Sequence, residues 1–161
     1  MTEPKSITAQ TPPDAIRLDE YWPYQVTVLA DRISRRTAAI VKREAGLNLS
    51  QWRVLAAIAE CPGRTAAEVV MMTPMDKGIV SRATKALLSG GYLVREASQQ
   101  DGRVSHLFLT QAGADLYSAL KPSVEAVARG ANLHLSDPDQ AAFCTRLKQL
   151  ADALPDTELN G

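Results

Sequence analysis

The sequence has few aromatic residues, few cysteines and no long apolar run, and each shortage excludes a class of protein. Aromatic residues make up 5% of the 161 residues, against 45% hydrophobic and 22% charged residues, a balance typical of a globular domain. No apolar run reaches the roughly 18 residues of a membrane-spanning helix, and the first 15 residues lack the apolar core of a secretory signal. Cys61 and Cys144 form neither a metal-type pair nor a disulfide framework, which favours a reducing cytoplasm.

The motifs of common enzymes and metal sites are also missing. The chain has no G-x-S-x-G, no P-loop, no G-x-G-x-x-G after a strand and no H-E-x-x-H. Its two histidines, His106 and His134, have no cysteine or histidine at ligand spacing. We therefore expect no metal, no cofactor and no enzymatic activity, with a catalytic triad scattered through the sequence as the alternative.

Charge is balanced over the whole chain and unbalanced along it. The 18 basic and 18 acidic residues cancel, but residues 31–103 hold 12 basic and 7 acidic residues. The ends are acidic, with 2 basic and 4 acidic residues over 1–30 and 4 basic and 7 acidic over 104–161. A basic middle indicates a surface for a polyanion, although ordinary variation in surface charge explains it equally well.

Apolar periodicity and capping residues predict six helices and one hairpin. Residues 1–17, with three prolines, are expected to be a mobile arm. Thr65 and Glu68 form a capping box, Ser50, Thr73, Thr110 and Ser136 are expected caps, and Pro122 predicts a kink or local break near Ala119. The expected helices are 18–45, 50–60, 65–72, 76–89, 110–131 and 136–154, and the expected strands are 92–96 and 104–109.

The third and fourth of these helices, joined by a tight Thr-Pro turn, have the arrangement of a helix-turn-helix that reads a major groove. Polar side chains on the fourth helix could contact phosphate or bases, and Arg103 at the hairpin tip could enter a minor groove. For the helix alone an ordinary solvated face is the favoured interpretation, but the helix-turn-helix, the hairpin and the tip arginine together favour DNA. The expected DNA-binding residues are Thr65, Lys77, Gly78, Ser81, Arg82, Thr84, Lys85, Asp101 and Arg103.

At these residues the chain resembles the MarR (multiple antibiotic resistance regulator) family of bacterial winged-helix repressors. The resemblance rests on QWRVLAAI, TAAEVV, MDKGIVSRATKALLSGGYLVRE, DGR and LTQAG, and covers about residues 18–155. Asp101 and Arg103 match the family's wing acid and its groove-inserting arginine, while Gly102 replaces the first arginine of the family's D-R-R. Arg82 matches a position of the recognition helix that reads a base or contacts phosphate.

The resemblance implies a mainly α fold with a small β-hairpin wing: a winged helix-turn-helix with N- and C-terminal dimerisation helices. It also implies a homodimer that binds a pseudo-palindromic double-stranded operator in the bacterial cytoplasm, nucleoid-associated when bound. The expected parts are the arm at 1–17, a dimerisation helix at 18–48, the DNA-binding lobe at 49–110, C-terminal dimerisation helices at 111–155 and a tail at 156–161.

Members of the family commonly bind small aromatic molecules between the dimer helices and the DNA-binding lobe. Here Tyr21, Tyr24, Val28, Arg32 and Arg35 share one face of the first expected helix. With Trp52 nearby, such a cleft would suit an aryl carboxylate held by Arg32 or Arg35, although core packing is the commoner use of such a stripe. The expected ligand-binding residues are Tyr24, Val28, Arg32 and Trp52.

Two other regulators fit the same resemblance. A thiol redox-sensing repressor needs an exposed, activated cysteine, whereas Cys61 and Cys144 are expected to pack between helices. A DNA-binding protein without an effector is the second. The sequence therefore predicts a transcriptional regulator, most simply a repressor released by a small aromatic or phenolic acid.

Overall fold

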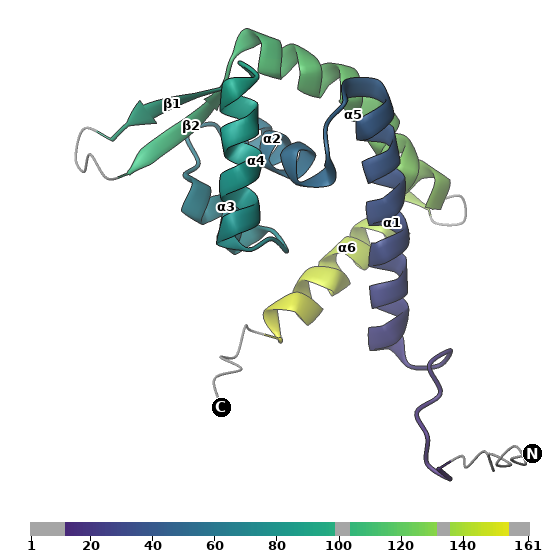
Figure 1. The fold of residues 1–161 in the computed structure, drawn as a ribbon. Coiled ribbons are helices and arrows are strands. Elements are labelled where there is room, and N and C mark those ends of the chain that lie inside the picture. Colours follow the sequence, from purple (N-terminus) through teal and green to yellow (C-terminus); the bar gives the residue numbers. More distant parts are fainter. Residues whose placement is uncertain (1–11, 99–103, 132–135, 155–161) are drawn as a thin grey trace, which may run out of the picture. The chain divides into compact units, whose positions relative to one another are not determined.

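The computed structural model describes residues 12–98, 104–131 and 136–154. The chain divides into two compact units, Met1–Arg35 and Arg36–Gly161. The elements, in chain order, are α1 (Trp22–Ala45), α2 (Leu49–Glu60), α3 (Ala66–Met72), α4 (Lys77–Ser89), β1 (Leu93–Ala97), β2 (Ser105–Leu109), α5 (Gln111–Ala131) and α6 (Asp137–Asp152) (Figure 1). The predicted mainly helical fold with one hairpin is confirmed.

The first helix is shorter at its start than predicted. Residues 18–20 form turns, and α1 begins at Trp22, directly before Pro23. Proline is tolerated in a first turn but disrupts a helix interior, so the helix begins one residue before Pro23 instead of at Leu18. The end is as predicted, because Gly46 adopts φ +68° and its N–H donates to Lys42 O at 3.0 Å.

The cap of α2 lies two residues before the predicted Ser50. Asn48 Oδ1 accepts from Gln51 N at 2.9 Å, and Gln51 Oε1 accepts from Asn48 N at 2.8 Å. This reciprocal capping box satisfies two backbone donors at once. Ser50 instead lies within the first turn of α2, so the predicted Ser50 cap is wrong.

The two helices of the helix-turn-helix begin on different kinds of cap. The predicted Thr65–Glu68 capping box of α3 is confirmed. The predicted Thr73 cap of α4 is wrong, because Asp76 Oδ1 accepts from Ile79 N at 2.7 Å. A carboxylate also interacts favourably with the positive end of the helix dipole. Thr73 belongs to the end of α3, where its hydroxyl donates to Val69 O at 2.6 Å.

The hairpin follows α4 and pairs with the segment before α3. β1 and β2 are antiparallel, in a register that places Leu93 opposite Leu109. On the other edge of β2, Gly63 N donates to Leu107 O at 2.8 Å, and Leu107 N donates to Arg64 O at 3.1 Å. The hairpin is thereby tied to the segment from which α3 begins. The hairpin tip, 99–103, lies outside the described residues.

The core of the second unit lies between α2, α3, α4, α5 and the hairpin. Its fully buried side chains come from α1, α2, α3, α4, β2 and α5: Val41, Val54, Leu55, Ile58, Val69, Val80, Leu87, Leu107 and Leu120. The predicted buried face of α4 is confirmed at Val80, Ala83 and Leu87, while Ile79 is half-buried.

The fifth helix packs closely against the start of the hairpin. Thr110 Oγ1 accepts from Gly113 N at 3.0 Å, which confirms the predicted cap. A Cβ at Gly113 would overlap the carbonyl oxygen of Tyr92, so only glycine permits this approach. α5 continues unbroken through Pro122 and bends along its length (Figure 1), so the predicted kink forms without a break.

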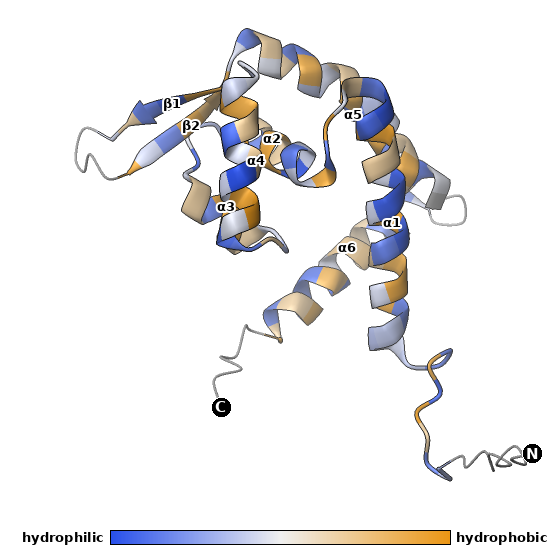
Figure 2. Ribbon diagram, viewed as in Figure 1, coloured by the Kyte–Doolittle hydropathy of each residue, from blue (hydrophilic) through white to orange (hydrophobic). Residues whose placement is uncertain are grey.

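The last helix has no buried residue. Ser136 caps α6 as predicted and accepts from Asp139 N at 3.4 Å. Apolar residues alternate with polar ones along the helix (Figure 2), and Phe143 and Leu147 remain 45% and 37% exposed. Of the apolar stripe predicted for this helix, Phe143 and Leu147 thus remain exposed and Leu150 is half-buried. Leu154 lies beyond the helix end.

Candidate nucleic-acid interface

One face of α4 carries exposed polar and cationic side chains. The exposed members of the predicted set are Lys77, Gly78, Ser81, Arg82 and Lys85. The spacing of four residues between Lys77, Ser81 and Lys85 places them on one side of the helix. This face is opposite the buried stripe of Val80, Ala83 and Leu87.

Thr84 differs from the others. Its side chain is 2% exposed and belongs to the buried side of α4. It therefore does not lie on the exposed face that DNA would meet, contrary to the expectation from the sequence. Thr84 lies three residues after Ser81 and one before Lys85. Helical spacing alone therefore did not distinguish the exposed face of α4 from the buried side next to it.

The cations near this face are not neutralised by neighbouring acids. Within the described ranges, no ion pair involves Lys77, Arg82, Lys85 or Arg95, whereas Arg35 pairs with Asp31 at 2.9 Å elsewhere. Unpaired cations on one surface leave a positive potential that attracts a polyanion. The basic middle of the sequence thus has a structural counterpart.

Gly78 leaves room beside Arg82. A Cβ on Gly78 would lie 3.4 Å from Arg82 Nη1 and 3.2 Å from Asp76 Oδ1. The Arg82 side chain therefore lies back along α4 towards its N-terminus, the direction in which helical side chains lean. Because glycine has no side chain, nothing projects from α4 at this point of the exposed face, which allows a ligand to approach the backbone closely.

Thr65 caps the N-terminus of α3. Its hydroxyl accepts from Glu68 N at 3.2 Å and donates to Glu68 Oε2 at 2.9 Å, and its backbone N–H donates to Glu68 Oε2 at 2.7 Å. The hydrogen bonds from Thr65 hold the pKa of Glu68 below its usual value, backbone first and hydroxyl second. The structure thus gives Thr65 a clear role in starting α3.

Two side chains fix the segment that precedes α3. Arg64 Nη1 donates to Ala57 O at 2.7 Å and to Glu60 Oε2 at 2.6 Å, and the hydrogen bond to Glu60 raises the pKa of Arg64. His106 Nδ1 lies 2.8 Å from Gly63 O. These contacts set where α3 stands against the hairpin, and spacing in the sequence gave no sign of them.

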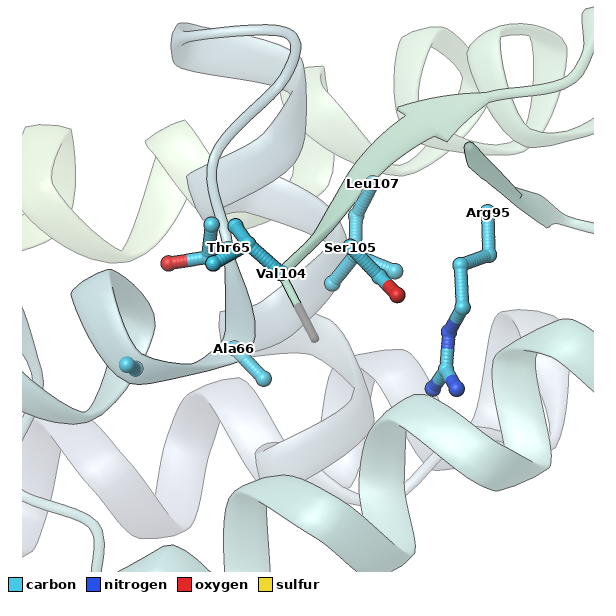
Figure 3. A pocket seen from close by; sticks show the side chains of 7 residues that line it. Thr65, Ala66, Arg95, Val104, Ser105 and Leu107 are labelled. Carbon is cyan, nitrogen blue, oxygen red and sulfur yellow. The ribbon is translucent and has the colours of Figure 1, made fainter. Parts of the chain in front are cut away.

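Arg95 is a cation that motif reasoning did not single out. It is exposed on β1 and lines two neighbouring cavities, one of about 320 Å³ shared with Thr65, Ala66 and Ser105. In Figure 3 its extended side chain lies across this cavity from Thr65 and Ala66. The signal was present as the arginine at the fourth position of the strand motif YLVRE.

The predicted ligand-binding residues divide between the two units. Tyr24 is 42% exposed, Val28 is half-buried and Arg32 is exposed in the first unit. Arg32 has no ion-pair partner within the described part of the chain, while Arg35 is held by Asp31. Trp52, in the second unit, is 8% exposed and stacks on Tyr117.

Both cysteines are exposed, so the prediction that Cys61 and Cys144 pack between helices is wrong. Cys61 ends α2, and Cys144 belongs to the helix without buried residues. Asp101 and Arg103, the arm at 1–11 and the tail beyond 154 lie outside the described residues.

The described residues contain no metal-type cluster and no helix suited to a membrane. Histidine, cysteine, aspartate and glutamate form no group of three or more suited to a metal ion among the described residues. In the same ranges, no helix combines the length and apolar content that crossing a bilayer requires.

Comparison with known proteins supports the winged-helix interpretation. The model of the MarR family matches residues 45–104, which run from the end of α1 through β1 and end at Val104, directly before β2. A comparison with curated protein sequences finds no match.

Similar solved structures extend the likeness to most of the chain. A MarR-family transcriptional regulator from Silicibacter pomeroyi has a TM-score of 0.79 at 23% identity, covering 89% of this chain and 96% of the other. BpsR of Bordetella bronchiseptica, whose DNA binding is regulated by 6-hydroxynicotinic acid, has a TM-score of 0.63 at 23% identity, with 79% and 98% covered. A mutant MarR from E. coli, complexed with operator DNA, has a TM-score of 0.68 at 19% identity, with 80% and 91% covered.

Proposed function

We propose that this chain is a transcriptional regulator of the MarR family, which its winged-helix segment and its fold support, and that it binds a pseudo-palindromic operator as a homodimer. In this proposal α4 enters the major groove, and the protein acts as a repressor on bacterial chromosomal DNA in the cytoplasm. The observation that carries the proposal is the exposed face of α4, where Lys77, Arg82 and Lys85 have no acidic partner within the described ranges.

Each exposed side chain of α4 has a role in this proposal. Arg82, beside the low surface of Gly78, is the candidate for bidentate contact with guanine. Lys77 and Lys85 are suited to phosphate contacts, and Ser81 can reach either phosphate or base. Asp101 and Arg103 are proposed to act at the wing, where an arginine would enter the minor groove.

Exposed apolar surface supports the homodimer. In the first unit, Val26, Leu29 and Ile33 of α1 are each 41% exposed. In the second unit, α6 has no buried residue and exposes Phe143 and Leu147. Apolar stripes of this kind are normally covered by another chain, and a twofold axis would place two copies of α4 in successive major grooves.

We further propose a small aromatic acid as the effector, bound at Tyr24, Val28, Arg32 and Trp52. Arg32 is the better carboxylate partner of the two arginines considered, because Arg35 is already paired with Asp31 at 2.9 Å. Only one face or the edge of Trp52 is left for a ligand, because Tyr117 covers the other face. Release from DNA requires that the ligand prefer a form of the dimer that misfits the operator.

The exposure of both cysteines favours a second candidate, a repressor that senses oxidants through a thiol. Peroxide treatment, followed by mass spectrometry of Cys61 and Cys144 and measurement of DNA affinity, distinguishes a thiol sensor from an aromatic-acid sensor. An aromatic-acid sensor keeps its DNA affinity after such treatment, whereas a thiol sensor loses it and regains it on reduction.

The test of the DNA-binding face uses single variants Lys77→Gln, Arg82→Gln and Lys85→Gln, with Lys148→Gln on α6 as the control. DNA affinity is measured over a range of salt concentrations. Each lost phosphate contact should reduce the slope of log affinity against log salt by about 0.9. Arg82→Gln should instead cost about 1–3 kcal/mol at one position of each half-site if Arg82 reads a base. Wild-type affinity and slope in all three variants would contradict the assignment.

A further inference from the structure

His106 lies in the middle of a short three-stranded ladder at the base of the hairpin. On one side it is directly opposite Glu96 of β1, and on the other side it forms a bridge with Thr65, the cap of α3. Residues directly opposite each other in an antiparallel ladder stand on the same face, with Cβ atoms about 4.5–5.5 Å apart. The imidazole therefore stands between β1 and the segment from which α3 begins.

One ring nitrogen of His106 is already engaged. Nδ1 lies 2.8 Å from the carbonyl oxygen of Gly63, and a carbonyl oxygen only accepts hydrogen bonds, so Nδ1 carries the hydrogen of the neutral ring. The proton that the ring takes up in acid therefore goes to Nε2 and leaves the hydrogen bond to Gly63 in place. Protonation thus changes the charge of the half-buried His106 without changing how the ring is held.

Two carboxylates lie on the elements that flank the ring. Glu96 is its partner on β1, and Glu68 of α3 is held by Thr65, whose N–H and hydroxyl donate to Glu68 Oε2 at 2.7 and 2.9 Å. The hydrogen bonds from Thr65 are the main cause of the lowered pKa of Glu68, and the nearby charge of His106 lowers this pKa further. A charged imidazole is therefore attracted both to the hairpin and to α3.

The cations of the same elements are directed elsewhere. Arg64, in the segment before α3, donates to Glu60 Oε2 at 2.6 Å and so faces α2. Arg95 is opposite Leu107 in the ladder, which places it on the other face of the hairpin from His106. Among the described residues, the charged groups that face the ring from β1 and α3 are thus the two carboxylates.

We propose that His106 is a positioning residue for DNA binding, which in mild acid draws the hairpin and the start of α3 together. Histidine ordinarily gains its charge near about pH 6.5 and glutamate loses its charge near about pH 4.3, so the attraction is strongest between these values. The inference rests on the proposed function, in which the hairpin carries the groove-inserting Arg103. A hairpin held more firmly against α3 loses less conformational freedom on binding, so DNA affinity rises in mild acid.

The attraction is tested first without DNA, by thermal melting of the full chain. Because the folded state favours the protonated ring, this contribution to stability is present in mild acid and is lost as pH rises. The melting temperature of wild type, relative to that of His106→Asn, should therefore rise from about pH 8 to pH 6. Asparagine keeps a donor at the position of Nδ1 and does not titrate. Parallel profiles of the two proteins overturn the proposal, and His134→Asn, at the other histidine of the chain, should keep the wild-type profile.

The two carboxylates are tested by their own variants, which do not alter His106. Glu96→Gln changes an exposed side chain, and Glu68→Gln keeps the capping box, since glutamine serves there as well as glutamate. Each should reduce the rise in melting temperature between about pH 8 and pH 6, and the double variant should abolish it. Asp115→Asn, at an exposed site of α5, should leave the rise unchanged. A double variant with the wild-type profile overturns the role of the carboxylates.

The effect on DNA is measured with a site that the wild-type chain selects from random double-stranded DNA. Wild type and His134→Asn should bind it about threefold tighter at pH 6 than at pH 8, the effect of one partly exposed ion pair. His106→Asn should bind it equally at both pH values.

The salt dependence of the same binding distinguishes a positioning residue from a residue that contacts DNA. The slope of log affinity against log salt should be equal at both pH values, whereas a direct contact of protonated His106 with phosphate would increase it by about 0.9 and overturn the positioning role. A melting profile that depends on His106, with DNA affinity independent of pH, overturns the link to DNA. Failure of wild type to select any DNA overturns the proposed function, while the melting profiles still decide whether His106 draws the hairpin to α3.

Discussion

The indole of Trp52 on α2 stacks on the phenol ring of Tyr117 on α5, with 5.5 Å between ring centroids and 8° between ring planes. The pair joins the winged-helix lobe to the helix that follows its hairpin. Because Trp52 is only 8% exposed, Trp52→Ala should reduce the free energy of unfolding by about 3–5 kcal/mol.

Urea denaturation of the single and double variants Trp52→Leu and Tyr117→Leu isolates the contact between the two rings. A double-mutant cycle should give a coupling of about 0.5–1.5 kcal/mol. A coupling near zero would mean that the two rings contribute only through burial.

Gly78→Ala separates stability from function. Alanine favours a helix over glycine by up to about 1 kcal/mol, although the new methyl group would lie 3.2 Å from the capping Asp76 Oδ1. Thermal stability should therefore change little or rise, while DNA affinity falls about tenfold, or 1.4 kcal/mol, because the methyl group displaces Arg82 and raises the exposed face.

Gly130→Ala on α5 is the matched control, since a Cβ there meets nothing within 4 Å. It should raise stability and leave DNA affinity unchanged. If Gly78→Ala behaves in the same way, the low surface at Gly78 has no part in DNA binding.

Acid should loosen the start of α3. The pKa of Glu68 is lowered in the folded protein by its hydrogen bonds from Thr65, so its contribution to stability is present above the unfolded pKa and is lost as pH falls through the folded pKa. Melting temperatures of wild type should fall more steeply between about pH 5 and pH 3 than those of Glu68→Gln. Parallel pH profiles would contradict this role of the capping box.

The elements of the second unit could be predicted because each carries its own local signal. The Thr65–Glu68 box, the Ser136 cap and the glycines at helix ends act through bonds a few residues apart, so they are visible in the sequence. Where two nearby residues could both cap a helix, the predicted cap was wrong. Asn48 and not Ser50 caps α2, and Asp76 and not Thr73 caps α4.

Contacts between distant residues had no such signal. Burial of Thr84, the reach of Arg95 across the cavity and the anchoring of Gly63 by His106 depend on packing between α3, α4 and the hairpin. The exposure of Cys144 follows from the lack of any buried residue on α6, which apolar periodicity alone could not distinguish from packing.

The dimer can be tested on α6. Phe143→Asp or Leu147→Asp places a charge within the exposed apolar stripe, where burial against a partner would be costly, and should lower the mass in sedimentation from dimer to monomer or cause aggregation. Thr145→Asp, on the opposite side of the helix, should keep the dimer. A wild-type chain that is monomeric at micromolar concentration would contradict the proposal.

The central claim, that α4 reads DNA from a twofold dimer, is tested most directly by selecting bound sequences from random double-stranded DNA with the full chain. The selected sites should contain two inverted half-sites about 10 base pairs apart, centre to centre, and should be bound about 10³-fold tighter than scrambled DNA. The Lys77→Gln, Arg82→Gln, Lys85→Gln triple variant should select nothing. Selected sites without inverted symmetry, or selection of the same sites by the triple variant, would contradict the account.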